Sequence, residues 1–200
     1  MAPTSPSTES TKDEKPFLSD VNTLRARARE HIEEGAVTET YALDSKLVVK
    51  ILNEALATEI VCVLRYKRHY FMAKGIVAGS VAEEFLEHAS EEQEHADRIA
   101  ERIVQLGGEP NFSPEGLASR SHSEYVEGET LVDMIKEDLV AERIAIDSYR
   151  EIVQFLGDQD PTTRRMMEEI LASEEHHADD MADLLKDLPK QVALAKASIT

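Results

Sequence analysis

Four long stretches of the chain carry apolar residues at alternating steps of three and four positions, the period of an α-helix with one buried face. These helices are expected over residues 44–75, 80–107, 129–157 and 160–189. Asp160 followed by Pro161 marks the start of the fourth helix, and Pro189 marks its expected end. The pattern therefore predicts an all-α protein built on a four-helix bundle.

The lengths of the connections indicate the topology. Short turns join the first helix to the second and the third to the fourth, so each pair is expected to form an antiparallel hairpin. Between the second and third helices, the segment from Gly107 to about Gly128 is long enough to cross the length of the bundle. The predicted arrangement is two antiparallel hairpins joined by one long crossover.

The rest of the chain lies at its two ends. Residues near the N-terminus are mainly Pro, Ser, Thr and charged residues, which cannot bury enough apolar area to stay ordered. A short extra helix is expected from Asp20 to about Glu34, with Val21 and Leu24 on its apolar edge and Gly35 closing it. The predicted organisation is a disordered tail, an extension with the short helix, the bundle and a C-terminal tail, over residues 1–16, 17–43, 44–189 and 190–200.

The charge and the cysteine content of the chain exclude several classes of partner and of metal site. Asp and Glu number 40 against 22 Lys and Arg, giving a formal net charge of −18. Such a surface repels nucleic acid and anionic membranes and concentrates cations such as Fe²⁺. The single cysteine, Cys62, excludes disulfide scaffolds and Cys-pair metal sites within one chain, and it favours a reducing compartment. With no signal peptide or membrane span in the sequence, we expect a cytoplasmic protein with no membrane or nucleic-acid partner.

The candidate chemistry lies in two Glu-x-x-His pairs, each preceded by a lone glutamate on the previous helix. The six residues are Glu59, Glu92 and His95, and Glu142, Glu174 and His177. Glu59 precedes Glu92 by 33 residues and Glu142 precedes Glu174 by 32, which suggests an internal duplication. All six lie on the apolar stripes, so we expect them to face the bundle interior. An alternative with exposed, salt-bridging faces would also expose the apolar residues of the same stripes.

Four buried carboxylates at one level would repel one another, and a lone buried carboxylate would take up a proton. Two divalent cations balance four carboxylates and two neutral imidazoles. We therefore predict a di-metal site with Glu59 and Glu142 as terminal ligands and Glu92 and Glu174 as bridges. Oxygen ligands with only two imidazoles suit iron or manganese better than copper. Two iron ions are expected, with manganese or zinc as substitutes.

These motifs resemble those of bacterioferritin and its relatives in the ferritin-like superfamily, over about residues 46–188. The matching segments are LNEALATEIVCVLRY, EEQEHADRIAERIVQLGGEPN, DLVAERIAI and EILASEEHHAD, and they contain all six candidate ligands. The resemblance implies a ferritin-like four-helix bundle that assembles into a hollow shell. It also implies a ferroxidase that oxidises Fe²⁺ with O₂ or H₂O₂ and stores ferric mineral, with Tyr66 beside the catalytic site.

The chain departs from the family pattern at two places. Bacterioferritins bind haem through a methionine directly after the first bridging glutamate, and Gln93 stands at that position, so no haem is predicted. The short C-terminal tail is a poor match to the fifth helix of 24-subunit ferritins, so homo-oligomeric shells of 12 and of 24 subunits are both expected alternatives.

Two other functions fit the same motifs: a rubrerythrin-like or Dps-like di-iron protein that scavenges peroxide and stores little iron, and a non-catalytic shell or DNA-coating protein. Among residues near the ligands, Cys62 is interpreted as a buried core thiol. Tyr149 is expected either to bond a ligand or to pack in the core. His69 and His88 are interpreted as satisfied core histidines, and Glu91 as part of a solvated helix face.

Overall fold

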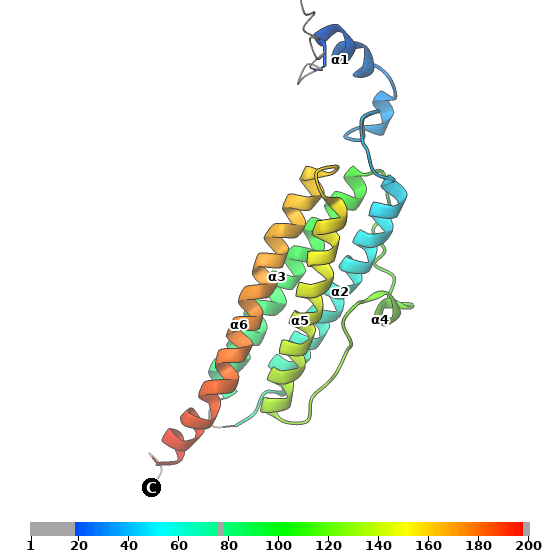
Figure 1. The fold of residues 1–200 in the computed structure, drawn as a ribbon. Coiled ribbons are helices and arrows are strands. Elements are labelled where there is room, and N and C mark those ends of the chain that lie inside the picture. Colours follow the sequence, from blue (N-terminus) through cyan, green and yellow to red (C-terminus); the bar gives the residue numbers. More distant parts are fainter. Residues whose placement is uncertain (1–18, 76–77, 198–200) are drawn as a thin grey trace, which may run out of the picture. The chain divides into compact units, whose positions relative to one another are not determined.

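The computed structural model describes residues 19–75 and 78–197, and all regular structure within these residues is helical (Figure 1). The four long helices are α2 (Ser45–Met72), α3 (Ala78–Gln105), α5 (Leu131–Leu156) and α6 (Pro161–Ala197). The three short ones are α1 (Val21–Arg27), η1 (Ile32–Glu34) and α4 (Leu117–Arg120). The all-α prediction is therefore confirmed. None of the helices in the described part of the chain is long and apolar enough to cross a membrane.

The long helices form the predicted pair of hairpins. Helix α2 packs antiparallel to α3, and α5 packs antiparallel to α6 (Figure 1). The crossover, residues 106–130, runs from the end of α3 along the bundle to the start of α5, and α4 lies within it against α2. This topology brings the middles of all four helices together.

Local hydrogen bonds explain where several helices begin. The Asp44 side chain accepts from the Lys46 backbone N–H at 3.0 Å and caps α2. Thr130 and Asp133 form a capping box at the start of α5, in which each side chain bonds the backbone N–H of the other. Gly157, with φ of +48°, ends α5 in a conformation that side-chain-bearing residues rarely adopt. Helix α6 begins at Pro161, as the sequence predicts.

The expected stripes are buried along the bundle axis. The stripes include Leu52, Phe85, Tyr149 and Ile170, which are buried, whereas Leu139 and Leu184 are half-buried. At one end of the bundle the core is a cluster of aliphatic and aromatic side chains: Tyr66, Val81, Phe85, Ala89, Met134, Ile135, Met181 and Leu188. The helical period thus predicts correctly which face of each helix is buried.

Two buried charged clusters tie one hairpin to the other. Between α2 and α5, the Asp138 carboxylate accepts from Arg65 Nε at 2.8 Å and lies 2.8 Å from His69 Nδ1. Between α3 and α6, Arg102 donates to Thr163 Oγ1 at 2.7 Å and to Asp160 Oδ1 at 3.1 Å. Because each charge has a partner, these clusters fix the relative position of the hairpins without leaving a buried charge unpaired.

Two sequence predictions about helix ends were wrong. Helix α6 does not end at Pro189 but continues to Ala197, since a proline removes one backbone hydrogen bond and the helix-forming residues after it support further turns. The predicted helix from Asp20 to Glu34 is broken: α1 ends at Arg27, and His31 takes a left-handed φ of +48° before η1. No residue of α1 is buried, and a helix this short is marginal without tertiary packing.

Contacts divide the chain into two compact units, Met1–Glu39 and Thr40–Thr200. The second unit contains the whole bundle. The tail expected over residues 1–16 lies outside the described residues, and the domain boundaries drawn from the sequence stay predictions.

Candidate metal centre

All six candidate ligands meet in the middle of the bundle, and each is 5% exposed or less. They form two overlapping groups whose donor atoms lie within 4.8 Å of one another. The first group is Glu59, Glu92, His95 and Glu174, and the second is Glu92, Glu142, Glu174 and His177. Glu92 and Glu174 belong to both groups, so these two carboxylates are placed to bridge two ions.

Eight buried donor atoms of these residues have no hydrogen-bond partner. They are both carboxylate oxygens of Glu92 and of Glu174, one oxygen each of Glu59 and Glu142, and Nδ1 of His95 and of His177. A buried polar atom without a partner costs about 1–3 kcal/mol, so such groups are rare unless a ligand satisfies them. Divided between two cations, this set gives each ion one imidazole nitrogen, one terminal carboxylate oxygen and one oxygen from each bridge. The donor set therefore fits two metal ions.

The pKa values of the clustered side chains also indicate a metal site. Burial and the nearby Glu92 and Glu174 carboxylates raise the pKa of Glu59 and of Glu142 well above the usual range. Burial lowers the pKa of His177, but its contacts with Glu174 and Glu92 outweigh burial and raise it to about 12. Without cations the cluster is thus stabilised by protons, and metal binding would displace them.

Two tyrosines hold the lone glutamates in a reciprocal way. Tyr66 on α2 donates its hydroxyl hydrogen to Oε1 of Glu142 on α5 at 2.5 Å. Tyr149 on α5 donates to Oε1 of Glu59 on α2. Each tyrosine follows the glutamate of its own helix by seven residues and binds the glutamate of the other. In both cases the remaining carboxylate oxygen is one of the eight atoms without a partner.

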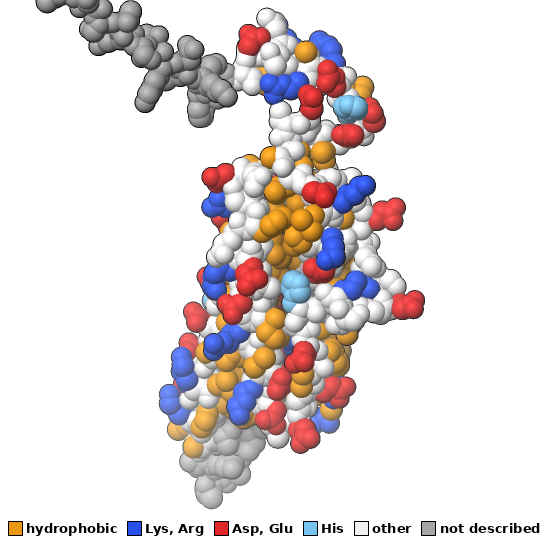
Figure 2. Space-filling model, turned by 45° about the vertical axis from the view of Figure 1, so that its right-hand side comes forward, with side chains coloured by type: hydrophobic (Ala, Val, Ile, Leu, Met, Phe, Trp, Pro, Cys, Tyr) orange, Lys and Arg blue, Asp and Glu red, His pale blue; other side chains and the backbone are white. Residues whose placement is uncertain are grey.

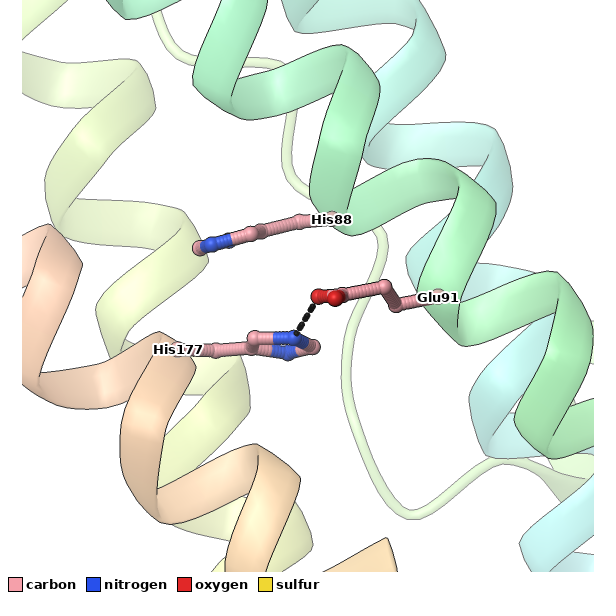
Figure 3. Close-up of side chains that lie close together, drawn as sticks. All are labelled: His88, Glu91 and His177. Carbon is pink, nitrogen blue, oxygen red and sulfur yellow. Dashed lines mark hydrogen bonds and ion pairs between the residues drawn. The ribbon is translucent and has the colours of Figure 1, made fainter.

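A further acidic residue, Glu91, contacts the cluster from α3. Figure 3 shows its carboxylate reaching the ring of His177, with 2.7 Å between Glu91 Oε2 and His177 Nε2. The solvated face expected for Glu91 is therefore only partly right, since the side chain is 44% exposed but bonded to a candidate ligand. Its position next to Glu92 gives no sign of this contact, because Glu91 and His177 are 86 residues apart in the sequence.

His88 lies over the same imidazole. Its ring stacks on His177 (Figure 3), with 4.1 Å between ring centroids. Its Nδ1 lies 3.2 Å from the Tyr66 hydroxyl. Burial and the neighbouring His177 lower the pKa of His88 to about 3. His88 is thus a neutral, buried imidazole next to the candidate ligands. His69 is bonded at both ring nitrogens, to Asp138 and to the Glu127 carbonyl.

Cys62 and Gln93 lie close to the ligands in sequence but not in the cluster. The Cys62 thiol is buried, accepts from Arg65 Nη2 at 3.4 Å and lies 3.6 Å from Ser123 Oγ. Burial raises the pKa of this thiol well above its usual range, which agrees with a core thiol. Gln93 is exposed on α3 and donates to Asp97 at 3.0 Å. The absence of haem stays a prediction.

Comparison with known proteins gives the family. Residues 49–191 match the ferritin-like domain family. The bacterioferritin of Brucella melitensis biotype 1 is 32% identical over 146 residues, which cover 72% of this chain and 85% of that protein. A dodecameric thioferritin of Bacteroides fragilis, a bacterioferritin-related protein, has a TM-score of 0.71 and 34% identity over 74% of this chain and 89% of its own. A mycobacterial bacterioferritin has a TM-score of 0.65 and 32% identity, covering 76% of this chain and 91% of its own. The chain therefore belongs to the ferritin-like family, and its relatives there include bacterioferritins.

Proposed function

We propose that this protein is a ferroxidase that oxidises Fe²⁺ at a di-iron centre and stores the ferric product inside a hollow shell of identical subunits. The observation that carries the proposal is the set of eight buried donor atoms without partners, shared between two four-residue groups. A pair of iron ions would supply the redox chemistry that these side chains lack.

The chain's own residues give the site its shape. Glu59 and His95 would hold one ion, Glu142 and His177 the other, and both bridging carboxylates would contact each ion. Tyr149 and Tyr66 each fix one oxygen of a terminal glutamate and leave the other for metal. Glu91 accepts from His177 Nε2, which directs Nδ1 of that ring toward the cluster and raises its basicity. The buried stripes on either side exclude bulk water.

A mutation at a bridge tests the oxidation step. Glu92→Gln removes the negative charge from both ion positions at nearly constant volume, so we expect initial Fe²⁺ oxidation to slow at least about 100-fold. His95→Gln should slow oxidation similarly by removing a nitrogen ligand. The matched control is Glu94→Gln, because Glu94 is exposed on the same helix. The oxidation is measured by absorbance after mixing with Fe²⁺ in air, on protein of unchanged native mass. Oxidation at the unmodified rate in Glu92→Gln would refute the assignment.

Hydrophobic side chains on one face of the bundle favour a shell. Figure 2 shows them gathered along the bundle, and a groove of about 420 Å³ on the α2 and α5 side is lined partly by Ile51, Ile152 and Phe155. Such a patch on a monomer is typical of a subunit interface. The Bacteroides fragilis relative is dodecameric, and twelve or twenty-four subunits are the expected sizes for this chain.

Native mass and iron content test storage. We expect an assembly of twelve or twenty-four chains that retains many iron atoms per subunit after aerobic loading. An assembled protein that retains only about two per subunit and consumes H₂O₂ faster than O₂ would instead identify a peroxide scavenger with little storage.

A further inference from the structure

A second group of metal-binding side chains lies next to the candidate di-iron centre, between α3 and α6. It consists of Glu84 and His88 on α3 and Asp180 on α6, with one donor atom of each within 4.8 Å of the others. His88 Nε2 lies 3.4 Å from Glu84 Oε1 and 3.5 Å from Asp180 Oδ2. None of the three belongs to the six residues of the candidate di-iron centre.

The hydrogen bonds of Tyr66 determine which nitrogen of His88 carries a hydrogen. The Tyr66 hydroxyl gives its only hydrogen to Glu142, so its oxygen can only accept from His88 Nδ1, 3.2 Å away. A neutral His88 that donates from Nδ1 has a bare lone pair on Nε2. The side chain is only 2% exposed, and the structure gives this nitrogen no hydrogen bond, only the two carboxylates at 3.4 and 3.5 Å.

The lone pair of Nε2 faces two carboxylates, which are also acceptors when ionised. Three acceptors pointing at one another are unfavourable unless a cation lies between them. A charged imidazolium would close to the 2.7–2.9 Å typical of charge-assisted hydrogen bonds, whereas the observed separations are 3.4 and 3.5 Å. The spacing is therefore that of donors around a shared ion rather than of a closed ion pair.

We propose that Glu84, His88 and Asp180 bind a third divalent transition-metal cation, separate from the di-iron pair. One imidazole nitrogen with two carboxylate oxygens suits Fe²⁺, Mn²⁺ or Zn²⁺, with water completing the coordination. Glu84 and Asp180 have side chains 34% and 31% exposed, so an ion can reach them from solvent. They line a groove of about 170 Å³ with Asp183 and Asp187, whose charges concentrate cations there.

The adjacent group of His88, Glu91 and His177 (Figure 3) does not make a competing site, because Glu91 and His177 already bond each other at 2.7 Å. His176 Nε2 also lies 3.5 Å from Asp180 Oδ2 and is available as a further ligand. The proposed ion would be linked to the di-iron centre by one relay, from His88 through Tyr66 to Glu142. A cation bound by Glu84, His88 and Asp180 would therefore lie between the acidic groove and the candidate di-iron centre.

The test counts bound ions in the whole oligomer. The unmodified protein, the double variant Glu84→Gln/Asp180→Asn and the control Glu83→Gln/Asp179→Asn are dialysed to equilibrium against Mn²⁺ without O₂. The control changes the same charges one residue away on the same helices, at exposed positions. We expect the double variant to bind one Mn²⁺ fewer per subunit than either of the others. Crystals grown with Mn²⁺ should show anomalous density between Glu84 and Asp180, lost only in the double variant.

Equal stoichiometry in all three proteins, or no anomalous density at this position in the unmodified protein, would overturn the proposal. Failure of the di-iron assignment gives a different result, since it would lower the count equally in all three. If the double variant does not assemble, the single variant Asp180→Asn is compared with Asp179→Asn in the same way.

Discussion

The hydroxyl groups of Tyr66 and Tyr149 determine how the two lone glutamates are held. Each carboxylate is tied at one oxygen to a tyrosine from the opposite hairpin and presents its other oxygen to the centre. A ligand fixed in this way loses less conformational freedom when it binds metal. At the residue scale, the site is therefore organised in advance by groups that do not themselves bind metal.

Tyr149→Phe tests this organisation. Removal of the hydroxyl leaves Glu59 Oε1 without its donor, so we expect the affinity for the ion at Glu59 and His95 to fall about 10- to 100-fold. Competition with a chelator for Mn²⁺ measures the affinity, and Tyr125→Phe is the control because Tyr125 is 42% exposed and outside the site. Unchanged affinity at both positions would mean that the bond to Glu59 has no role in metal binding.

Glu91→Gln tests the contact on the other imidazole. The amide keeps the size of the side chain but loses the negative charge that supports His177 Nε2. We expect roughly tenfold weaker binding of the ion at Glu142 and His177, with the other position little affected. Competition with a chelator for Mn²⁺ measures the affinity at each position, and Glu94→Gln again serves as the control. An equal loss at both positions would argue against a contact specific to His177.

At the scale of elements, the start of α6 depends on Asp160. Its carboxylate accepts from the Thr163 backbone N–H at 2.9 Å, from the Tyr41 hydroxyl at 2.7 Å and from Arg102. Burial raises the pKa of Asp160, but the bonds from Thr163 and Tyr41 and the charge of Arg102 outweigh burial and lower it below the usual range. One residue thus joins α3, α6 and the segment before α2.

Asp160→Ala should lower the free energy of unfolding by about 2 kcal/mol, because it removes a helix cap and the carboxylate that pairs with Arg102. The stabilising effect of the ionised carboxylate is present above its unfolded pKa of about 3.9 and is lost as the pH falls through the lower folded value. Thermal unfolding of the metal-free protein from pH 3 to 7 measures both effects. Asp160→Asn keeps a cap but not the charge, so it should lose that part of the pH dependence. A pH profile identical to that of the unmodified protein would contradict this.

The sequence predicts the helices and their buried faces well, because the period of apolar residues reflects which face is covered. The same period also predicts that Glu59 and Glu142 face the interior, because each lies in step with the apolar residues of its own helix. Contacts such as Glu91 with His177, or Arg65 with Asp138, depend on how two helices are rotated and shifted against each other, and no local pattern records that. The predicted end at Pro189 failed because proline weakens one turn without forbidding the next.

At the scale of the whole molecule, the net charge of −18 predicts that this protein does not coat DNA. Acidic surfaces repel phosphate backbones, and the repulsion is strongest at low salt. We expect no retardation of duplex DNA in a gel-shift assay at low ionic strength, with a basic DNA-binding protein as the positive control. Retardation that disappears with added salt would show a basic region able to override the overall charge.

The two halves of the bundle carry the same Glu and Glu-x-x-His motifs, but the contact between Glu91 and His177 has no counterpart in the sequence of the second half. Glu91 stands directly before Glu92, whereas Ser173 occupies the corresponding place before Glu174. The first half therefore has a carboxylate directly before its bridging glutamate, and the second half does not. This carboxylate, Glu91, binds the imidazole of His177 in the second half. We therefore expect the two positions to bind metal in order, the first cation beside His177 and the second beside His95. A subunit with one cation would then be a single defined species rather than a mixture.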